Sequence, residues 1–74
     1  MRYVIASRAQ AADKGIDLTC HKMNDRIVIL NEKELETCPL LSSYPTLEEK
    51  AAAIDGTVHS FQSIQQQLKN GLLI

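Results

Sequence analysis

One local pattern occurs three times in this chain and limits the folds it can adopt. A short run of β-branched residues ends at a capping residue, and a helix-prone stretch follows. The three runs are residues 3–6, 26–30 and 57–59. Ser7, Asn31 and Ser60 follow these runs, and their side-chain oxygens suit the acceptor role at a helix N-terminus. The pattern predicts strands that alternate with helices.

Strands that alternate with helices favour parallel pairing through right-handed crossover connections. We therefore expect one α/β domain over residues 1–74, with a small three-stranded, mainly parallel sheet and about four helices. The fourth helix joins the three that follow the strands, and it lies between Thr46 and Gly56. Thr46 and Glu49 form a Thr-x-x-Glu capping box, and Gly56 is expected to end the helix.

Residues 16–23 leave two interpretations open. Ile16, Leu18 and Cys20 alternate with polar residues, so this stretch could be a strand. It would then turn at Asn24-Asp25 into the next run, which makes a hairpin at residues 16–30 and a mixed sheet. The other interpretation is a plain loop.

The chain is short, so its core must be thin. A chain of 74 residues buries only roughly 60–65% of the surface that its unfolded form exposes. Its composition, 45% apolar and 23% charged, is typical of globular proteins and argues against intrinsic disorder. The residues expected in the core are Val4, Ile5, Ile27, Ile29, Leu35, Leu47, Ile54, Val58, Phe61, Ile64 and Leu68.

The charge balance argues against nucleic acid as the main partner. Eight basic and nine acidic residues give a net charge of −1, whereas proteins that neutralise phosphates usually carry a basic excess. A local basic patch stays open as an alternative, and its members would be Arg2, Arg8, Lys14, Lys22 and Arg26. No segment approaches the ~20 apolar residues of a membrane span. We expect a soluble, cytoplasmic protein without a membrane partner.

Neither a metal site nor an enzyme is expected. Cys20, His21, Cys38 and His59 lack the paired spacing of zinc ligands, and two cysteines are too few for a disulfide framework. The thiols are therefore expected to be reduced, without a Cys20–Cys38 disulfide. The glycines fit helix ends rather than a phosphate-binding loop. We expect no cofactor and no catalytic residues.

The three junctions suggest one candidate ligand site. If the strands were parallel, Ser7, Asn31 and Ser60 would meet at the carboxyl edge of the sheet, where open α/β sheets bind ligands. Free amides at three helix N-termini, with Arg8 and Lys33 beside them, would suit an anion or a nucleotide.

The chain's last three residues, Leu72, Leu73 and Ile74, are apolar and could either join the core or cover a partner. Our first hypothesis is a small non-enzymatic interaction module that contacts another protein or a second copy of itself as a homodimer. A domain that binds small anions or nucleotides is the alternative. A nucleic-acid-binding accessory protein is the third hypothesis.

Overall fold

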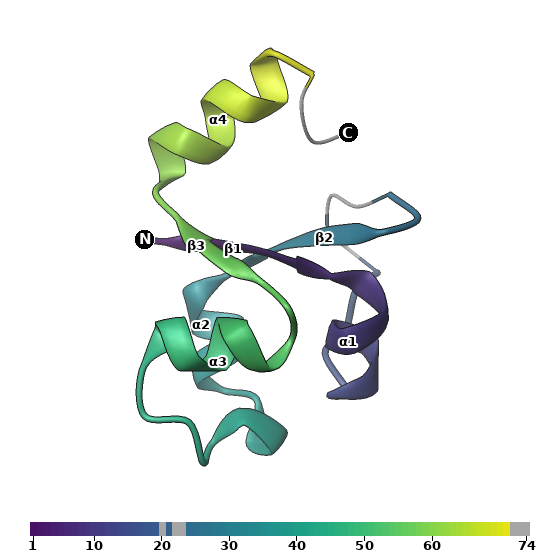
Figure 1. Cartoon of the computed structure of the whole chain (residues 1–74), viewed down its shortest axis with the longest axis vertical. Coiled ribbons are helices and arrows are strands. Elements are labelled where there is room, and N and C mark those ends of the chain that lie inside the picture. The colour runs from purple at the N-terminus through teal and green to yellow at the C-terminus, as the bar shows by residue number, and fades with distance from the viewer. Residues whose placement is uncertain (20, 22–23, 72–74) are drawn as a thin grey trace.

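The computed structural model describes residues 1–19, 21 and 24–71. These residues form a small α/β domain with three strands and four helices, as the sequence predicts, and Figure 1 shows their arrangement. The strands are β1 (Tyr3–Ser7), β2 (Ile27–Asn31) and β3 (Thr57–His59). The helices are α1 (Arg8–Asp13), α2 (Glu32–Glu36), α3 (Leu47–Ala53) and α4 (Phe61–Lys69), with a 3-10 turn η1 (Pro39–Leu41) between α2 and α3.

The predicted capping residues begin all four of these helices. Each cap accepts a hydrogen bond from the backbone amide three residues later, which satisfies a donor that has no partner within the helix. The bonds are Gln10 N to Ser7 Oγ (3.4 Å), Glu34 N to Asn31 Oδ1 (3.0 Å), Glu49 N to Thr46 Oγ1 (3.1 Å) and Ser63 N to Ser60 Oγ (3.1 Å). Local capping chemistry therefore sets where each helix starts.

The prediction of a mainly parallel sheet is wrong. The strand order is β2-β1-β3, and β1 pairs antiparallel with both neighbours. The connection through α1 brings the chain back to the end of β1 that it left. Arg8 N donates to Arg26 O at 2.9 Å, and Ile27 lies opposite Ser7. The chain therefore enters β2 beside the end of β1, which makes this pair of strands antiparallel.

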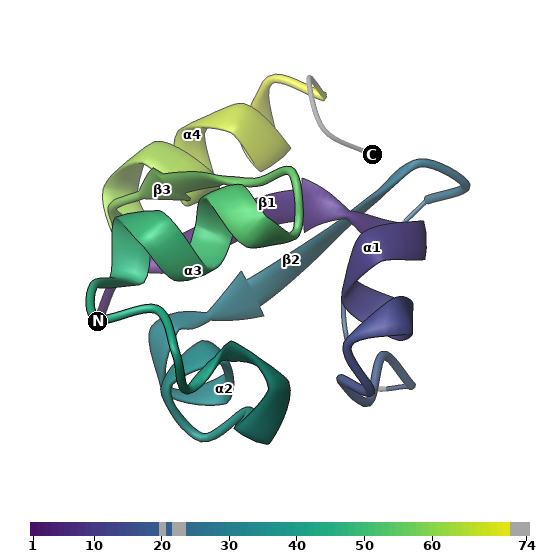
Figure 2. The ribbon, with the colours of Figure 1, turned by 60° about the horizontal axis from the view of Figure 1, so that its bottom comes forward.

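A parallel relationship does exist, but between strands that do not touch. Because β2 and β3 are both antiparallel to β1, they run in the same direction on either side of it. The long connection through α2, η1 and α3 joins them across one face of β1 (Figure 2). The sequence pattern therefore predicted a crossover connection, which here joins β2 to β3. It did not show that β1 would lie between these two strands.

Residues 16–23, for which the sequence allowed either a strand or a loop, contain no strand in the part that the structure describes. Residues 16–19 and 21 lie in loop and turn conformations, which agrees with the loop interpretation. The chain enters β2 through Asn24, whose Oδ1 accepts hydrogen bonds from Arg26 N (2.8 Å) and Ile27 N (2.9 Å). This side-chain turn fixes the start of the strand.

The main core lies between one face of the sheet and α1, α2 and α3 (Figure 1). Strand alternation puts Val4, Ala6, Val28 and Leu30 on that face, and all four are buried. The helices and η1 supply the rest of this cluster: Ala11, Leu35, Cys38, Leu41, Leu47, Ala51 and Ile54. Helix α4 lies on the opposite face of the sheet (Figure 1).

Burial confirms most of the predicted core and corrects one member. Six predicted residues are buried: Val4, Ile29, Leu35, Leu47, Ile54 and Ile64. Ile5, Ile27, Val58 and Leu68 are only half-buried. Phe61 is 50% exposed, so its placement in the core is wrong.

Gly56 does more than follow a helix. The left-handed residue after α3 is Asp55, with φ of 54°, rather than the glycine. Gly56 instead lies against β1, where an added Cβ would stand 2.9 Å from the Cβ of Ala6 and 3.0 Å from the carbonyl oxygen of Ile5. Only a residue without a side chain allows the turn between α3 and β3 to approach the central strand this closely.

Candidate functional site

Helix α4 is amphipathic but lightly attached to the sheet. Ile64 is its one buried side chain, with 4% exposure. Ser63, Gln67 and Leu68 flank Ile64 and are half-buried. On the other side of the helix, spaced three and four residues apart, Gln62, Gln65, Gln66 and Lys69 are exposed. A single buried apolar side chain is a small attachment for a helix of nine residues.

A series of side-chain hydrogen bonds adds to that attachment at His59, the last residue of β3. His59 Nε2 lies 2.7 Å from Thr57 Oγ1, and His59 Nδ1 lies 3.5 Å from Gln67 Nε2. Gln67 Nε2 also donates to Ser63 Oγ at 3.1 Å. Because the Gln67 amide nitrogen is a donor, Nδ1 acts as the acceptor, and Nε2–H donates to the threonine hydroxyl. These hydrogen bonds connect α4 to β3.

Phe61 is the first residue of α4, and its ring packs against Tyr3 of β1. Its ring lies with its centroid 5.8 Å from that of Tyr3, and the two planes are inclined by 38°. Tyr3 therefore covers one side of the ring, while half of the Phe61 surface stays exposed. The ring is therefore held by a second aromatic residue on one side and open to solvent on the other.

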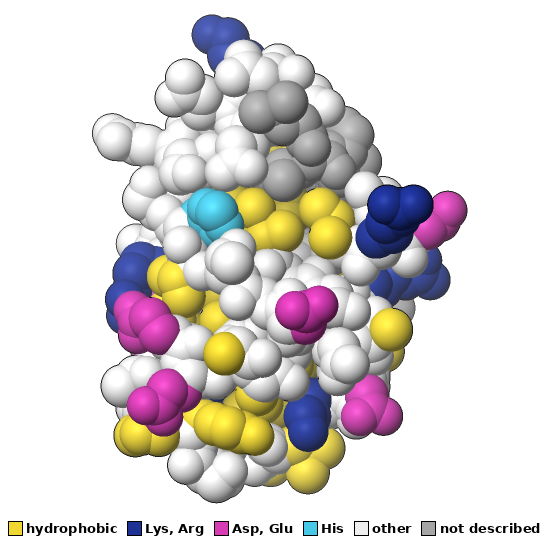
Figure 3. Space-filling model, in the orientation of Figure 1, with side chains coloured by type: hydrophobic (Ala, Val, Ile, Leu, Met, Phe, Trp, Pro, Cys, Tyr) yellow, Lys and Arg dark blue, Asp and Glu magenta, His cyan; other side chains and the backbone are white. Residues whose placement is uncertain are grey.

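Charge is nearly absent from this part of the chain. All nine acidic residues and seven of the eight basic residues precede Gly56, and Lys69 is the one Lys or Arg that follows it. In Figure 3 no acidic side chain appears over α4, and a strip of hydrophobic side chains reaches the surface between α4 and the sheet. We call Tyr3, Phe61, Gln62, Gln65 and Gln66 the α4 face.

A hollow of about 620 Å³ lies along α4, and its described lining residues come from this helix and its C-cap, Asn70. They include the three exposed glutamines together with Leu68. The hollow therefore combines amide groups with an apolar side chain.

The structure does not gather the five residues predicted to bind an anion. Because the strands are antiparallel, Ser7 and Arg8 lie at one end of β1, opposite Ile27. Asn31 and Ser60 lie at the other end, since Asn31 and His59 both pair with Tyr3. Lys33 lies in the first turn of α2, whose N-cap is Asn31, and its side chain is exposed. The premise of one shared edge is therefore incorrect.

The basic residues of the alternative patch do not all lie together: Arg2 precedes β1, whereas Arg8 and Arg26 lie side by side at the other end of that strand. Arg2 contacts two carboxylates, with Nη1 2.9 Å from Glu48 Oε1 and Nη2 3.6 Å from Glu32 Oε2. Arg8, at the other end of β1, has Nη1 4.0 Å from Asp25 Oδ1. Lys22 lies outside the described residues. Arg2 and Arg8 therefore stand beside acidic partners, which weakens any attraction for phosphate at these two residues.

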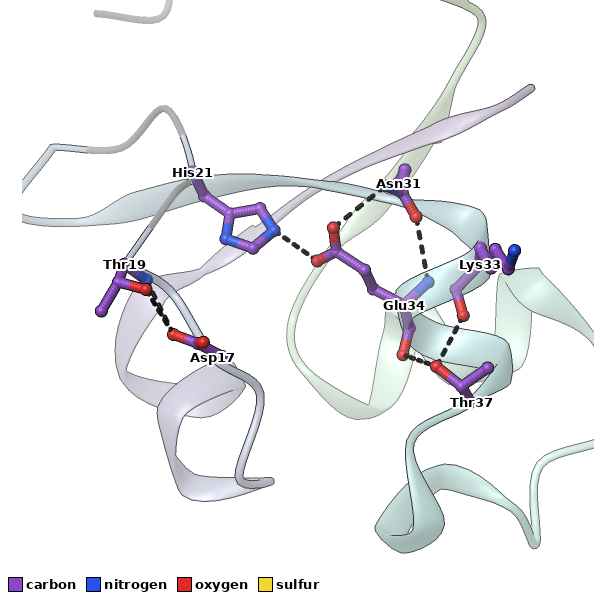
Figure 4. A network of polar contacts seen from close by, with 7 residues as sticks. All are labelled: Asp17, Thr19, His21, Asn31, Lys33, Glu34 and Thr37. Carbon is purple, nitrogen blue, oxygen red and sulfur yellow. Dashed lines mark hydrogen bonds and ion pairs between the residues drawn. The ribbon is translucent and has the colours of Figure 1, made fainter.

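A polar network that sequence reasoning missed holds the α1–β2 connection against α2 (Figure 4). His21 Nε2 contacts Glu34 Oε2, and the other carboxylate oxygen of Glu34 accepts from Asn31 Nδ2 at 3.0 Å. The Asn-x-x-Glu capping arrangement was visible in the sequence, but nothing showed that His21 would reach its glutamate. Within the described residues, His21 Nδ1 is buried without a hydrogen-bond partner.

Beside this network lies a hollow of about 230 Å³ that is lined in part by Asp17, Glu34 and Cys38. Each of these groups has a partner within the protein. The Cys38 thiol is buried and donates to the Lys14 carbonyl at 3.5 Å. Hydrogen bonds from Thr19 N (3.0 Å) and Thr19 Oγ1 (2.8 Å) lower the pKa of Asp17 below its ordinary value. We assign this network a structural role.

Among the described residues, no three His, Cys, Asp or Glu side chains lie close enough together to hold a metal ion. Cys20 and the predicted contact residues Leu72, Leu73 and Ile74 lie outside the described part of the chain, so those expectations stay predictions. No described helix has the length and apolar character needed to cross a bilayer. In comparisons with protein-family models, with curated proteins and with solved structures, nothing matches this chain.

Proposed function

We propose that this chain is a non-enzymatic interaction module that contacts another protein through the α4 face. The observation that carries the proposal is the half-exposed Phe61, fixed against Tyr3 on a surface almost without charge. Cores of protein interfaces are enriched in aromatic residues and depleted of charged ones. The α4 face has both properties, whereas the charged residues of the other elements favour contact with water.

Energetic considerations support this choice of surface. Full burial of a phenylalanine side chain contributes about 1.5–3 kcal/mol, so covering the exposed half of Phe61 would contribute about half of that. Burying neutral glutamine amides costs much less than burying carboxylates or ammonium groups, and a partner's polar groups can replace the lost water. Aromatic anchors surrounded by such contacts are typical of binding hot spots.

The proposal can be tested by site-specific photo-crosslinking in the cells from which the chain comes. The photoreactive residue p-benzoylphenylalanine replaces Gln62, which is exposed on α4. In a matched control it replaces Glu36, which is exposed on α2, across the sheet. We expect discrete protein adducts from position 62 and none from position 36.

Mass spectrometry of each adduct identifies what the α4 face contacts. Adducts that form equally at both positions would show that the surface has no preference, and would refute the proposal. The absence of adducts at position 62, with the variant folded and expressed at wild-type level, would also refute it. Thermal unfolding of both purified variants supplies the folding control.

A further inference from the structure

The end of α4 carries two residues whose side chain and backbone can react with each other. Asn70 is the C-cap of the helix, Gly71 follows it, and both are exposed. The backbone nitrogen of a residue can attack the side-chain amide of a preceding asparagine, and glycine hinders this attack least because it has no Cβ. We propose that Asn70–Gly71 is a deamidation site, at which the chain converts its own asparagine into a carboxylate at the end of α4.

The reaction uses only water and the atoms of these two residues. The Gly71 nitrogen loses its proton to hydroxide and forms a bond to Asn70 Cγ. The side-chain nitrogen takes a proton from water and leaves as ammonia, which regenerates the hydroxide and closes a five-membered succinimide ring. Water then adds to one of the two ring carbonyl carbons and breaks its bond to the ring nitrogen. The product is aspartate or isoaspartate, in which the backbone runs through the side chain.

The structure distinguishes Asn70 from the other two asparagines of the chain. Asn24 Oδ1 accepts hydrogen bonds from two backbone amides, and both polar side-chain atoms of Asn31 are bonded to Glu34. Within the described residues, no hydrogen bond restrains the side chain of Asn70. A Cβ added to Gly71 would meet no described atom within 4 Å beyond its chain neighbours, so the space beside the attacking nitrogen is open.

The folded helix holds the reaction back until its last turn opens. Gly71 N donates to Leu68 O at 3.1 Å, and Asn70 has a ψ of −2°, which keeps that nitrogen away from Cγ. Ring closure therefore requires the hydrogen bond to break and ψ to rotate. Helix ends open locally at low free energy, and Ile64 is the one buried side chain that holds α4 on the sheet. The rate of deamidation thus depends on how often the end of α4 opens.

The new carboxylate changes the surface around α4, and its effect on binding rests on the proposed function. Asn70 lines the hollow along α4 together with the exposed glutamines. A negative charge at a helix C-terminus is unfavourable, because it faces the partial negative charge of the terminal carbonyl groups. It also places an acidic group on a surface that has none, whereas the cores of protein interfaces are depleted of charge. Deamidation would therefore act as a slow, one-way switch that weakens contact through α4.

Prolonged incubation of the purified chain at mildly alkaline pH, followed by peptide mass spectrometry, tests the proposed site. Asn24 and Asn31 are the internal references. We expect Asn70 to convert at least tenfold faster than either, through a succinimide that hydroxylamine traps. An intact Asn70, or equal conversion of all three asparagines, would overturn the inference.

Ile64→Ala tests the opening step, because it removes the buried side chain of α4. It should speed the conversion of Asn70 and leave Asn31 unchanged, as expected of a local opening. The same rate at Asn70 in this variant and in wild type would refute the opening of α4 as the limiting step.

Photo-crosslinking at position 62 tests the switch and separates it from the proposed function. Asn70→Asp imitates the product, and Asn70→Gln is the matched control, which keeps an amide but disfavours ring closure. We expect the adduct yield of Asn70→Asp to be at least threefold lower than that of Asn70→Gln, and equal yields would refute the switch. If neither variant nor wild type captures a protein, the proposed function fails, whereas conversion of Asn70 in the purified chain still establishes the deamidation site.

Discussion

The ring centroids of Tyr3 and Phe61 lie 5.8 Å apart, so this aromatic contact connects the first strand to the start of the last helix. This contact lies outside the main core, which is on the other face of the sheet. The chain therefore places two of its three aromatic residues where they add little to core packing. Both residues belong to the α4 face, through which we propose that the chain contacts another protein.

Replacing Phe61 with alanine should cost little stability. From the sequence, burial of this residue predicts a loss of about 3–5 kcal/mol. With half of the side chain exposed, we expect about 1 kcal/mol, since the aromatic pair contributes about 0.5–1.5 kcal/mol. The melting temperature measured by circular dichroism should fall by about 4–8 °C.

Leu35→Ala provides the comparison, because Leu35 is fully buried in the main core. It should cost about 2–5 kcal/mol. If Phe61→Ala destabilised the protein as much as Leu35→Ala, the ring would be a core residue and not a contact point.

Gly56→Ala should destabilise the fold even though Gly56 does not have a positive φ. The added Cβ would come within 3.0 Å of Val4 Cγ1 as well as of the Ala6 Cβ. Such overpacking costs about 1–3 kcal/mol, which urea denaturation can measure. Gly15→Ala is the contrasting variant, because that site is open and strained only by its φ of 78°. A stability unchanged by Gly56→Ala would show that the turn can move away from β1.

The sequence predicted local structure better than it predicted how distant segments pair. Helix starts at Ser7, Asn31, Thr46 and Ser60 were correct because capping depends on residues three positions apart. Strand direction depends instead on where each connection leads, and the connection through α1 returns to the end of β1 that it left. The predicted anion site assumed a parallel sheet, in which Ser7, Asn31 and Ser60 share one edge. Because β1 is antiparallel to both neighbours, that prediction failed as well.

The candidate site was harder to predict for a similar reason. Phe61 follows a β-branched strand and begins a helix, so its pattern is that of a core residue. Nothing local shows that α4 lies on the face opposite the other helices, which leaves the ring half exposed. The lack of charge after Gly56 is visible in the sequence, and it is the signal that could have indicated this surface.

Asp17 should stabilise the fold at neutral pH and lose that effect in acid. Hydrogen bonds from Thr19 lower its pKa in the folded state below the ordinary 3.8. A carboxyl group of this kind stabilises the fold above its unfolded pKa, and the effect disappears as pH falls through the lower folded value. The stability difference between wild type and Asp17→Asn should therefore disappear in that acidic range.

Thr19→Val offers a more direct measurement, because it removes the hydroxyl donor and keeps the backbone donor. The pKa of Asp17, followed by carbon NMR of its carboxyl group, should rise part of the way toward its ordinary value. A pKa that does not change in this variant would show that the threonine hydroxyl contributes nothing.

Phosphate should not perturb the three capped junctions together. Ser7 lies at the end of the sheet opposite to Asn31 and Ser60, so one anion cannot contact all three. Titration with inorganic phosphate or a nucleotide to a few millimolar should leave the amide resonances of residues 7–10, 31–34 and 60–63 without a common binding curve. A single shared dissociation constant for all three groups would restore the anion-binding hypothesis.

The central claim is that this chain contacts another protein through the α4 face, and the most direct test is the photo-crosslinking comparison of positions 62 and 36. Discrete protein adducts should form from position 62 on α4 and not from position 36, which is exposed on α2 across the sheet. Equal adducts at both positions, or none at position 62 from a folded variant expressed at wild-type level, would contradict the claim.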